Sequence, residues 1–540
     1  MTIELRVEQL VIRLSLAAFL VAAPFFAYKS LSANQPQPEK AAEHSLESAA
    51  PGRSSSDQAN AKLVQLIEKT INESNFAEAR WGIHVISVSD GHVLYSRNGD
   101  KLFTPASNMK LYTTAAALDL LGADYRWRTS VYADTQPNAN GILHGNLVLY
   151  GRGAPDLVSE TGKDNSNSLS ELANTLFQKG LRRIEGNVIG DESYFRGEPI
   201  GDGWQWNDLQ WYFGAEASAL SVNANQVEVS VAPPEKSSST PTIRTSDTTG
   251  YVSLLPNMAI VKSGEPFRLG IQRGLSDNRV RVWGEFPSGS KGYGAQLAVH
   301  NPALWTTLLF IDALKKLGIT VGGQAVTRDW RVPATERFDP TRSTELAFVT
   351  GKNLLEITKA TNKQSINLNA ELILRTLGRE RGSISDSSPG RERGDEESGA
   401  AVIRLWLERN GVPVKGLAIH DGSGLSRLDL VTPEATSGLL LAMWRTNSGQ
   451  MFRETLPAAA TDGTLRGRLK GLEKQLAAKT GALTYDNSLS GYLVAKSGET
   501  FAFSIMCNDQ TAPGSSIRVI DQIAEILASH PNFEPDKGKK

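Results

Sequence analysis

Cysteine and net charge are both scarce in this sequence. One cysteine, Cys507, occurs among 540 residues, so no intrachain disulfide can form, and we expect this thiol to be a buried small side chain. The formal net charge is -1 at pH 7, which excludes the strongly basic composition typical of nucleic-acid binding. We therefore predict no nucleic-acid partner.

Two common catalytic signatures are also absent. Seven histidines are present, but none forms an HxH or HExxH pair, so no metal site is predicted. The GxSxG turn that presents the nucleophile in many serine hydrolases does not occur either. A serine hydrolase built from this chain therefore needs a different base and a different arrangement.

Long hydrophobic runs are rare, and the one near the N-terminus is short. The uncharged segment from Leu14 to Tyr28 falls below the roughly 20 residues that span a bilayer, and Pro24 interrupts it. Arginines precede this segment and small residues follow it, as in a secretory signal. We predict that residues 1–32 are a signal peptide or an uncleaved anchor. Either places the protein in the periplasm or cell envelope, with membrane contact only through the N-terminus.

The order of helix-like and strand-like segments along the chain predicts a mixed α/β (α+β) protein. The chain length suggests two to four domains. A helix, a hairpin around Asp90-Gly91 and a second helix come first; many short strand-like runs follow, and helices return near Asn301. We infer one domain split by a β-rich insertion of one or two small domains. The predicted segments are a disordered linker (33–58), the first part of the split domain (59–124), the insertion (125–292), the second part (293–530) and a polar tail (531–540). Residues 379–398 are predicted to be an inserted surface loop.

The segment FTPASNMKLYTTAAALDLLG, residues 103–122, predicts the start of a buried helix. Pro105 is tolerated in a first turn, and apolar residues recur at helical spacing after it. Ser107 and Lys110 are three residues apart and share one face. A serine hydroxyl is a weak nucleophile until a base removes its proton, and a buried lysine with a lowered pKa can be that base. The helix N-terminus also favours a developing oxyanion.

Two further segments supply what such a reaction needs. Ser365 and Asn367 lie at the start of another apolar helix, and Ser365 could relay a proton to the leaving group. Lys479, Thr480 and Gly481 begin a strand-like segment. Lys479 could lower the pKa of Lys110 and hold a substrate carboxylate beside the Thr480 hydroxyl, while Gly481 lets the backbone approach the substrate. The backbone N–H of Ala482 could join that of Ser107 as an oxyanion hole.

Isolated copies of these short motifs also occur, but in turn or strand contexts. Ser288 and Lys291 fit SxxK among glycines and serines, and no apolar helix follows. Ser221 and Asn223 fit SxN, but a strand-like run continues from them; the relaxed KTG copies at 262–264 and 496–498 lie in predicted turns. Only one set places the three motifs in helix, helix and strand contexts, in that order.

The motifs SNMK, SIN and KTG resemble those of the penicillin-recognising serine acyltransferases. Positions 107 and 365 are 258 residues apart, far more than in β-lactamases. That interval is similar to the class C low-molecular-mass penicillin-binding proteins, the D-Ala-D-Ala carboxypeptidase/endopeptidases of the penicillin-binding protein 4 type. GDESYFRG, HDGSGLSRLDLVTP and LPAAATDGTLRGRL also match, so the resemblance covers about residues 60 to 530. It implies a transpeptidase-like, β-lactamase-like domain.

The resemblance also implies roles for these residues. Ser107 would be acylated by the penultimate D-Ala of a peptidoglycan stem peptide or cross-link, with Lys110 as general base. Ser365 and Asn367 would shape the proton relay, and Lys479 with Thr480 would bind the terminal carboxylate. Water would hydrolyse the acyl-enzyme, and no metal or organic cofactor would be needed. β-Lactams would acylate the same serine, and the family offers precedent for homodimers.

Four positions are weaker inferences from the resemblance. Asp208, near Phe213, could meet the amino group of a diamino acid side chain, or it could be a turn residue. Arg427 could line the same pocket or form a surface salt bridge, and Thr484 lies near the contact with the stem residue. The middle of the second motif is Ile366 where Asp is frequent, but that position is variable, so catalysis is little affected.

Two alternatives remain open at this stage. A β-lactamase or esterase could use the same fold, although no glutamate-bearing deacylation loop is identifiable and the long insertion argues against it. A peptidoglycan-binding scaffold without turnover is the other. Its expected sign is a broken motif, and all three motifs are intact.

Overall fold

The computed structural model describes residues 55–159, 167–235, 239–333, 335–383 and 394–530. The predicted signal or anchor, most of the predicted linker and the polar tail lie outside these residues. The first four residues of helix α1 (Ser55–Asn72) fall within that predicted linker, so the linker ends earlier than predicted. None of the helices in the described ranges is long and apolar enough to cross a membrane.

The first domain is built on an antiparallel sheet with the strand order β17-β18-β19-β1-β2. Its edge strand β17 carries the KTG motif, and the β1–β2 hairpin turns at the predicted Asp90-Gly91. Strands from both ends of the chain therefore form one sheet, as expected for a split domain. The strands are β1 (Arg80–Ser87), β2 (Val93–Arg97), β17 (Leu476–Leu483), β18 (Asp486–Val494) and β19 (Thr500–Asn508).

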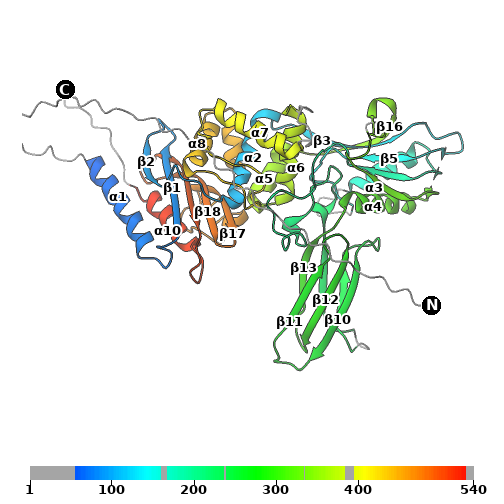
Figure 1. The fold of residues 1–540 in the computed structure, drawn as a ribbon, viewed down its shortest axis with the longest axis horizontal. Helices are drawn as coiled ribbons and strands as arrows, with labels where there is room; N and C mark the ends of the chain where they lie inside the picture. Colours follow the sequence, from blue (N-terminus) through cyan, green and yellow to red (C-terminus); the bar gives the residue numbers. More distant parts are fainter. Residues whose placement is uncertain (1–54, 160–166, 236–238, 334, 384–393, 531–540) are drawn as a thin grey trace, which may run out of the picture. The chain divides into compact units, whose positions relative to one another are not determined.

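Helices cover both faces of this sheet (Figure 1). Helix α1 and α10 (Ile517–Ala528) pack against each other and against one face, where their apolar residues meet Ile83, Val85 and Phe503. The opposite face is covered by α8 (Pro433–Trp444), which packs next to α2 (Met109–Leu121), the helix that directly follows the predicted serine motif turn. Further helices of the same cluster pack around α2: α5 (Leu354–Gln364), α6 (Asn367–Arg381), α7 (Asp395–Arg409) and α9 (Gly449–Thr455).

The inserted region contains a second five-stranded sheet, of order β15-β7-β5-β3-β16, and is rich in strands as predicted. Parallel pairs join β15, β7 and β5, and antiparallel pairs join β5, β3 and β16. Its strands are β3 (Arg126–Ala133), β5 (Leu147–Tyr150), β7 (Val188–Asp191), β15 (Ala325–Arg328) and β16 (Thr344–Asn353). Three small sheets accompany it: β4 (Ile142–Leu143), β6 (Arg183–Ile184) and β14 (Thr320–Val321); β8 (Gln226–Ala232), β9 (Thr242–Thr245) and β13 (Tyr293–Ala298); and β10 (Ser253–Val261), β11 (Arg268–Arg273) and β12 (Arg279–Pro287).

The inserted region ends later than predicted. Strand β16 pairs with β3 and ends at Asn353, and helix α4 (Pro302–Lys316) packs on β7 and β15. The boundary at residue 292 was therefore wrong, because the return of helices near Asn301 was interpreted as the return of the first domain. Helix α4 instead covers the inserted sheet, so the insertion runs from about β3 to β16.

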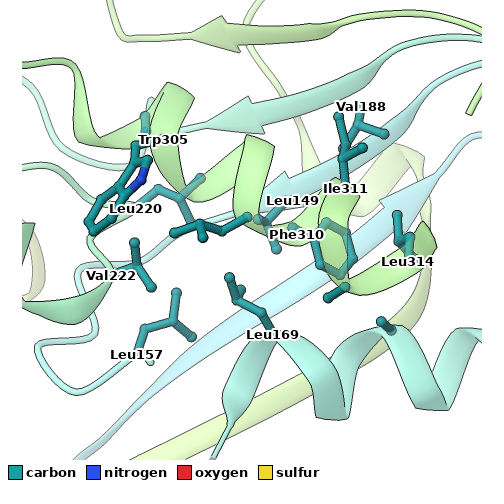
Figure 2. Packing of buried hydrophobic residues seen from close by; sticks show 14 of the residues in the cluster. Leu149, Leu157, Leu169, Val188, Leu220, Val222, Trp305, Phe310, Ile311 and Leu314 are labelled. Carbon is teal, nitrogen blue, oxygen red and sulfur yellow. The ribbon is translucent and has the colours of Figure 1, made fainter. Parts of the chain in front are cut away.

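The core of the inserted region lies between this sheet and the helices α3 (Ser168–Gln178) and α4 (Figure 2). Phe310 and Leu314 of α4 lie near Leu169 of α3 and the strand residue Leu149, and all four are fully buried. Burying a side chain of this size stabilises a fold by about 1.5 to 3 kcal/mol. This core consists of residues of the inserted region, and a smaller cluster that includes Phe195 and Leu372 joins that region to helix α6.

The predicted polar loop is shorter than expected at both ends. Helix α6 continues to Arg381 and α7 begins at Asp395, so regular structure takes in residues at each side of the 379–398 segment. Residues 384–393 of this segment lie outside the described ranges.

Candidate active site

Ser107 lies in a short 3-10 turn, η1 (Ala106–Asn108), directly before helix α2. Ala106 has a φ of +49°, in the left-handed region that costs free energy for a residue with a side chain. The Asn108 side chain donates to Ser490 Oγ of β18 at 2.7 Å. The serine is thus held in a strained turn that is anchored to the sheet.

Lys110 is fully buried in the first turn of α2, and its Nζ has three oxygen neighbours. Nζ lies 3.0 Å from Ser107 Oγ, 2.6 Å from Asn367 Oδ1 and 2.7 Å from the carbonyl oxygen of Ser423. A neutral amine has two hydrogens and one lone pair. Because the two closer oxygens belong to a carbonyl and an amide and can only accept, the two hydrogens point to them and the lone pair points to Ser107. This geometry suits removal of the serine proton.

Burial and neighbouring charges shift the pKa of Lys110 in opposite directions. Burial lowers the pKa of Lys110 to about 8, while the nearby carboxyl groups of Asp421, Glu371 and Asp429 raise it. Burial also raises the pKa of Glu371 to about 7 and that of Asp429 well above its usual value. The pKa of Lys110 therefore lies closer to neutrality than that of an exposed lysine. Burial of the neighbouring carboxyl groups favours their neutral forms, which limits how far they raise it.

Asp421 organises the loop that carries the Ser423 carbonyl. Its carboxylate accepts from the backbone N–H groups of Gly424 at 2.6 Å and Ser426 at 2.7 Å, and from the indole of Trp204 at 2.9 Å. Trp204 belongs to the inserted region. Both parts of the chain therefore hold the loop from which Lys110 receives one of its three contacts.

Gly424 packs this loop against the serine turn and predicts a sensitive substitution. Its φ is +80°, and a Cβ atom there would lie 1.8 Å from the Ala106 carbonyl oxygen. We expect Gly424→Ala to lower the free energy of unfolding by about 3 kcal/mol, from left-handed strain together with the backbone clash. Gly411→Ala is the control, since Gly411 has a φ of +71° and open space around it; we expect a loss of about 1 kcal/mol. Equal denaturant midpoints for the two variants would contradict the close approach.

Lys479 is the second buried lysine of the site. Its Nζ donates to Ser365 Oγ at 2.9 Å and to the Thr480 carbonyl oxygen at 2.7 Å. Burial and the charge of Lys110 lower the pKa of Lys479. Ser365 ends helix α5 in a left-handed conformation and lies two residues before Asn367, the first residue of α6. The sequence placed both residues at the start of α6 but did not predict α5.

Gly481 lets the edge strand β17 lie close to the serine turn. A Cβ atom at Gly481 would lie 2.7 Å from the Pro105 carbonyl oxygen and 2.2 Å from Ser488 Oγ. Ser488 Oγ in turn donates to that Pro105 carbonyl at 2.8 Å. The glycine therefore brings the KTG strand beside Ser107, as the sequence predicted for a close backbone approach.

A cavity of about 630 Å³ opens over Ser107. It is lined by residues of the first two motifs, by the three residues directly after the KTG motif, and by residues of the inserted region and of the loops after α7 and α9. The predicted site residues that line it are Ser107, Ser365, Asn367, Asp208, Phe213, Arg427 and Ala482, with Thr484. Gln205, Tyr212, Leu425 and Thr464 also line it and were not singled out from the sequence. A larger cavity of about 790 Å³, around Asp202 and His420, contains none of the three motifs.

Three weaker predictions, Asp208, Phe213 and Arg427, all line this cavity but make different contacts. Burial raises the pKa of Asp208, and the charge of Arg427 opposes that shift. Arg427 also donates to Asp486 Oδ2 at 2.7 Å and to the Thr484 carbonyl at 2.9 Å, so it both lines the pocket and forms the predicted type of salt bridge. The Phe213 carbonyl accepts from Asn367 Nδ2 at 2.8 Å. The inserted region therefore contacts the second motif directly.

The isolated motif copies lie away from this cavity. Ser288 and Lys291 are exposed in the turn between β12 and β13. Residues 262–264 follow the end of β10, and 496–498 form the turn between β18 and β19. Ser221 is buried and bonds within its own segment. Across the described ranges, no group of three or more His, Cys, Asp or Glu side chains is arranged to hold a metal ion.

The buried carboxyl groups near Lys110 were missed from the sequence. Asp421 and Asp429 lie within the segment HDGSGLSRLD, where only Arg427 was chosen. Aspartate followed by Gly-Ser-Gly indicates a side chain that bonds to its own turn, and this signal could have identified Asp421. Glu371 lies within the apolar run of helix α6, where a single charged residue among apolar neighbours was the available signal; the structure buries it fully.

Comparison with known proteins identifies the family. Residues 63–530 match the profile of the D-Ala-D-Ala carboxypeptidase 3 (S13) family. This chain belongs to the S13 family. The D-alanyl-D-alanine carboxypeptidase of Actinomadura sp. (strain R39) is 31% identical over 504 residues, covering 90% of this chain and 88% of that relative. The D-alanyl-D-alanine carboxypeptidase DacB of Haemophilus influenzae is 25% identical over 455 residues, covering 82% and 88%. The resemblance and the hydrolase class predicted from the motifs are confirmed.

Solved structures confirm the fold expected for an S13 protein. The crystal structure of penicillin binding protein 4 (dacB) from Haemophilus influenzae matches with a TM-score of 0.74 at 23% identity, over 87% of this chain and 99% of that chain. A crystal structure of the same protein complexed with a β-lactam matches with a TM-score of 0.69 at 21% identity, over 87% and 100%. The predicted mixed α/β, penicillin-binding fold with its insertion is therefore present.

The lowered pKa of Lys110 predicts a pH dependence for this S13 enzyme. As the proposed base, Lys110 would act through its neutral amine, whose fraction rises with pH and reaches a plateau above the pKa of about 8. We expect kcat/KM for acylation to rise between about pH 7 and 9, with a midpoint near 8. Asp421→Asn removes a carboxylate that raises the pKa of Lys110, so the midpoint should move to lower pH. A midpoint that stays or moves upward in this variant contradicts this assignment of charges.

Proposed function

We propose that this protein hydrolyses the D-Ala-D-Ala termini of peptidoglycan stem peptides, and D-Ala-diamino acid cross-links, through an acyl-enzyme on Ser107. The observation that carries the proposal is the position of Lys110 Nζ, 3.0 Å from Ser107 Oγ and within hydrogen-bond distance of Asn367 Oδ1 and the Ser423 carbonyl oxygen. The family profile and the Actinomadura relative support the substrate class, since both are named for D-Ala-D-Ala carboxypeptidases.

In the first step, Ser107 Oγ attacks the carbonyl carbon of the penultimate D-Ala while Lys110 takes the hydroxyl proton. The N–H groups of Ser107 and Ala482 stabilise the oxyanion. The C–N bond then breaks, and the proton that Lys110 took passes through Ser365 to the leaving amine, so Lys110 is neutral again before the second step. Ser365 Oγ accepts from Lys479 at 2.9 Å. The product is an ester on Ser107 and free D-Ala, or the free amine of the other stem in a cross-link.

In the second step, water attacks the ester carbonyl as Lys110 takes one of the water protons. The proton returns to Ser107 as the ester bond breaks, so the enzyme is regenerated with no net proton change. Lys479 and Thr480 hold the terminal carboxylate of the substrate. Asp208, beside Phe213 and Arg427, meets the charged amine of the stem peptide's diamino acid, since its carboxylate lines the same cavity.

β-Lactams enter the proposal as inhibitors, because ring opening by Ser107 gives an ester with no departing group. The complex of the Haemophilus influenzae protein with a β-lactam supports this reading for a protein of the same fold. Export to the periplasm or cell envelope follows from the substrate, with any membrane contact confined to the N-terminus. A homodimer is compatible with the proposal and is not needed by the chemistry.

The test compares two peptides that share one acyl part and differ in the leaving group. One ends in D-Ala-D-Ala, and the other joins D-Ala to the side-chain amine of a diamino acid. We expect release of D-Ala from the first and of the amine from the second. A β-lactam should give a burst of one equivalent followed by slow turnover. A folded protein that releases neither product overturns the proposal. If it also takes up no β-lactam, the peptidoglycan-binding scaffold is favoured; rapid β-lactam turnover without either product favours a β-lactamase.

A further inference from the structure

We infer that Thr464 is a second hydroxyl ligand of the substrate's terminal carboxylate, beside Thr480. Thr464 lies in the short turn η5 (Gly463–Leu465), far from the three motifs in sequence. The inference rests on the proposed function, which places a carboxylate at Lys479 and Thr480. It adds a specificity residue to that site.

A bound carboxylate needs more donors than the KTG strand offers. The anion has two oxygens and about four lone-pair positions, whereas the Thr480 hydroxyl supplies one hydrogen. Lys479 Nζ already donates to Ser365 Oγ and to the Thr480 carbonyl. Ala482, next along the strand beyond Gly481, has no side-chain donor. A further hydroxyl beside Thr480 therefore fills a gap in the site.

Thr464 provides that hydroxyl at the required place. Its Oγ1 lies 2.7 Å from Thr480 Oγ1, and the side chain lines the same cavity as Ser107. Two hydroxyls in contact share one hydrogen, so one O–H group stays free to rotate toward the cavity. When an anion arrives, both hydroxyls can turn and donate to it, and two charge-assisted hydrogen bonds replace one neutral bond.

The loop around Thr464 is held rigidly toward the motifs. Asp462 Oδ1 accepts from the backbone N–H of Ala458 at 2.9 Å, and its Oδ2 accepts from Lys363 Nζ at 2.6 Å. Gly463 has a φ of +55°, and a Cβ atom there would lie 2.4 Å from the Lys363 carbonyl oxygen. Lys363 lies two residues before Ser365. The turn is thus fixed to the end of helix α5, whose cap Ser365 contacts Lys479. Because the turn is already held in place, substrate binding need not order Thr464 at a large cost in conformational entropy.

The charges of this region favour an anion. Asp462 of this loop forms an ion pair with Lys363 of helix α5, so its carboxylate faces a cation of its own. Arg427 is engaged by Asp486 on the other side of the pocket. Lys479 precedes Thr480 on β17, and a carboxylate bound beside it would favour its protonated form. A carboxylate at this point meets one ammonium group and two hydroxyl donors, while an uncharged terminus gains much less from the same donors.

The test measures discrimination between a carboxylate and its amide. The purified protein and its variants are assayed on two peptides that end in D-Ala-D-Ala and in D-Ala-D-alaninamide. Thr464→Val keeps the size and removes the hydroxyl. We expect kcat/KM for the carboxylate peptide to fall about tenfold, mainly through a higher KM, with little change for the amide. Thr464→Ser keeps the hydroxyl and should restore discrimination. Thr461→Val is the matched control in the same loop, and any effect of it should fall equally on both peptides.

The outcomes separate this inference from the proposed function. Equal losses on both peptides in Thr464→Val, at an unchanged thermal midpoint, would mean that Thr464 only supports the loop and would overturn the inference. Thr464→Ala serves the same comparison if the valine variant does not fold. If the parent protein hydrolyses the carboxylate peptide in preference to the amide, and Thr464→Val shows the same preference, the inference is overturned while the proposed function stands. A parent that cleaves neither peptide and takes up no β-lactam overturns the proposed function.

Discussion

Ser107→Ala is expected to reduce kcat/KM for D-Ala release by at least about 10⁴-fold, to the limit of detection. The variant removes the proposed nucleophile, whereas Lys110, Asn367 and the cavity stay in position. The side chain is small and the turn is anchored by neighbouring residues, so the thermal midpoint should change little. The measurement is the initial rate of D-Ala release at several enzyme concentrations, which excludes a contaminating hydrolase.

Ser288→Ala is the matched control for this loss. Ser288 heads the second SxxK copy and is exposed in the turn after β12. We expect it to retain the full rate. Loss of activity in Ser288→Ala, together with retention in Ser107→Ala, would reverse the assignment of the nucleophile.

Lys110→Met is expected to lower the acylation rate by about 10³-fold or more, because it removes the base and keeps an unbranched, buried side chain of similar length. The remaining rate should lose the limb with a midpoint near pH 8, since the group that titrates there is gone. Stopped-flow acylation by a chromogenic β-lactam measures both effects in one experiment. The variant also leaves Asn367 Oδ1 and the Ser423 carbonyl without their donor, so some loss of stability is expected.

Lys291→Met tests whether loss of any lysine in an SxxK motif has the same effect. Lys291 is exposed, and its replacement should leave both the rate and the pH profile unchanged. A Lys110→Met variant that keeps the limb near pH 8 would show that another group removes the serine proton. Lys479 would then be the next candidate, because it is the other buried lysine in contact with the motif residues.

The three motifs were predictable because each depends on short spacing. Ser107 and Lys110 share a helix face at three residues, and Lys479, Thr480 and Gly481 are consecutive, so local geometry sets their relation. Their assembly across hundreds of residues was inferred from the resemblance, and the fold and family are confirmed. The roles of the individual residues, including Asp208 and Arg427, stay predictions.

What the sequence did not supply depends on long-range packing. The later boundary of the insertion follows from the pairing of β16 with β3, which no local pattern specifies. The carboxyl cluster of Glu371, Asp421 and Asp429 is formed by separate segments that meet only when α6 and the loop after α7 pack on α2. Thr464 approaches Thr480 for the same reason, through a turn held by Lys363. Side-chain type and periodicity do not report such contacts.

The most direct measurement locates the covalent adduct left by benzylpenicillin. The protein is incubated with the β-lactam, digested with trypsin and analysed by mass spectrometry. Cleavage after Lys101 and Lys110 gives peptide 102–110, which contains Ser107, whereas cleavage after Arg281 and Lys291 gives peptide 282–291, which contains Ser288. We expect one intact penicillin mass on peptide 102–110, with fragmentation placing it on Ser107 rather than Thr104. An adduct on peptide 282–291, or a folded protein with no adduct, would contradict the acyl-enzyme on Ser107.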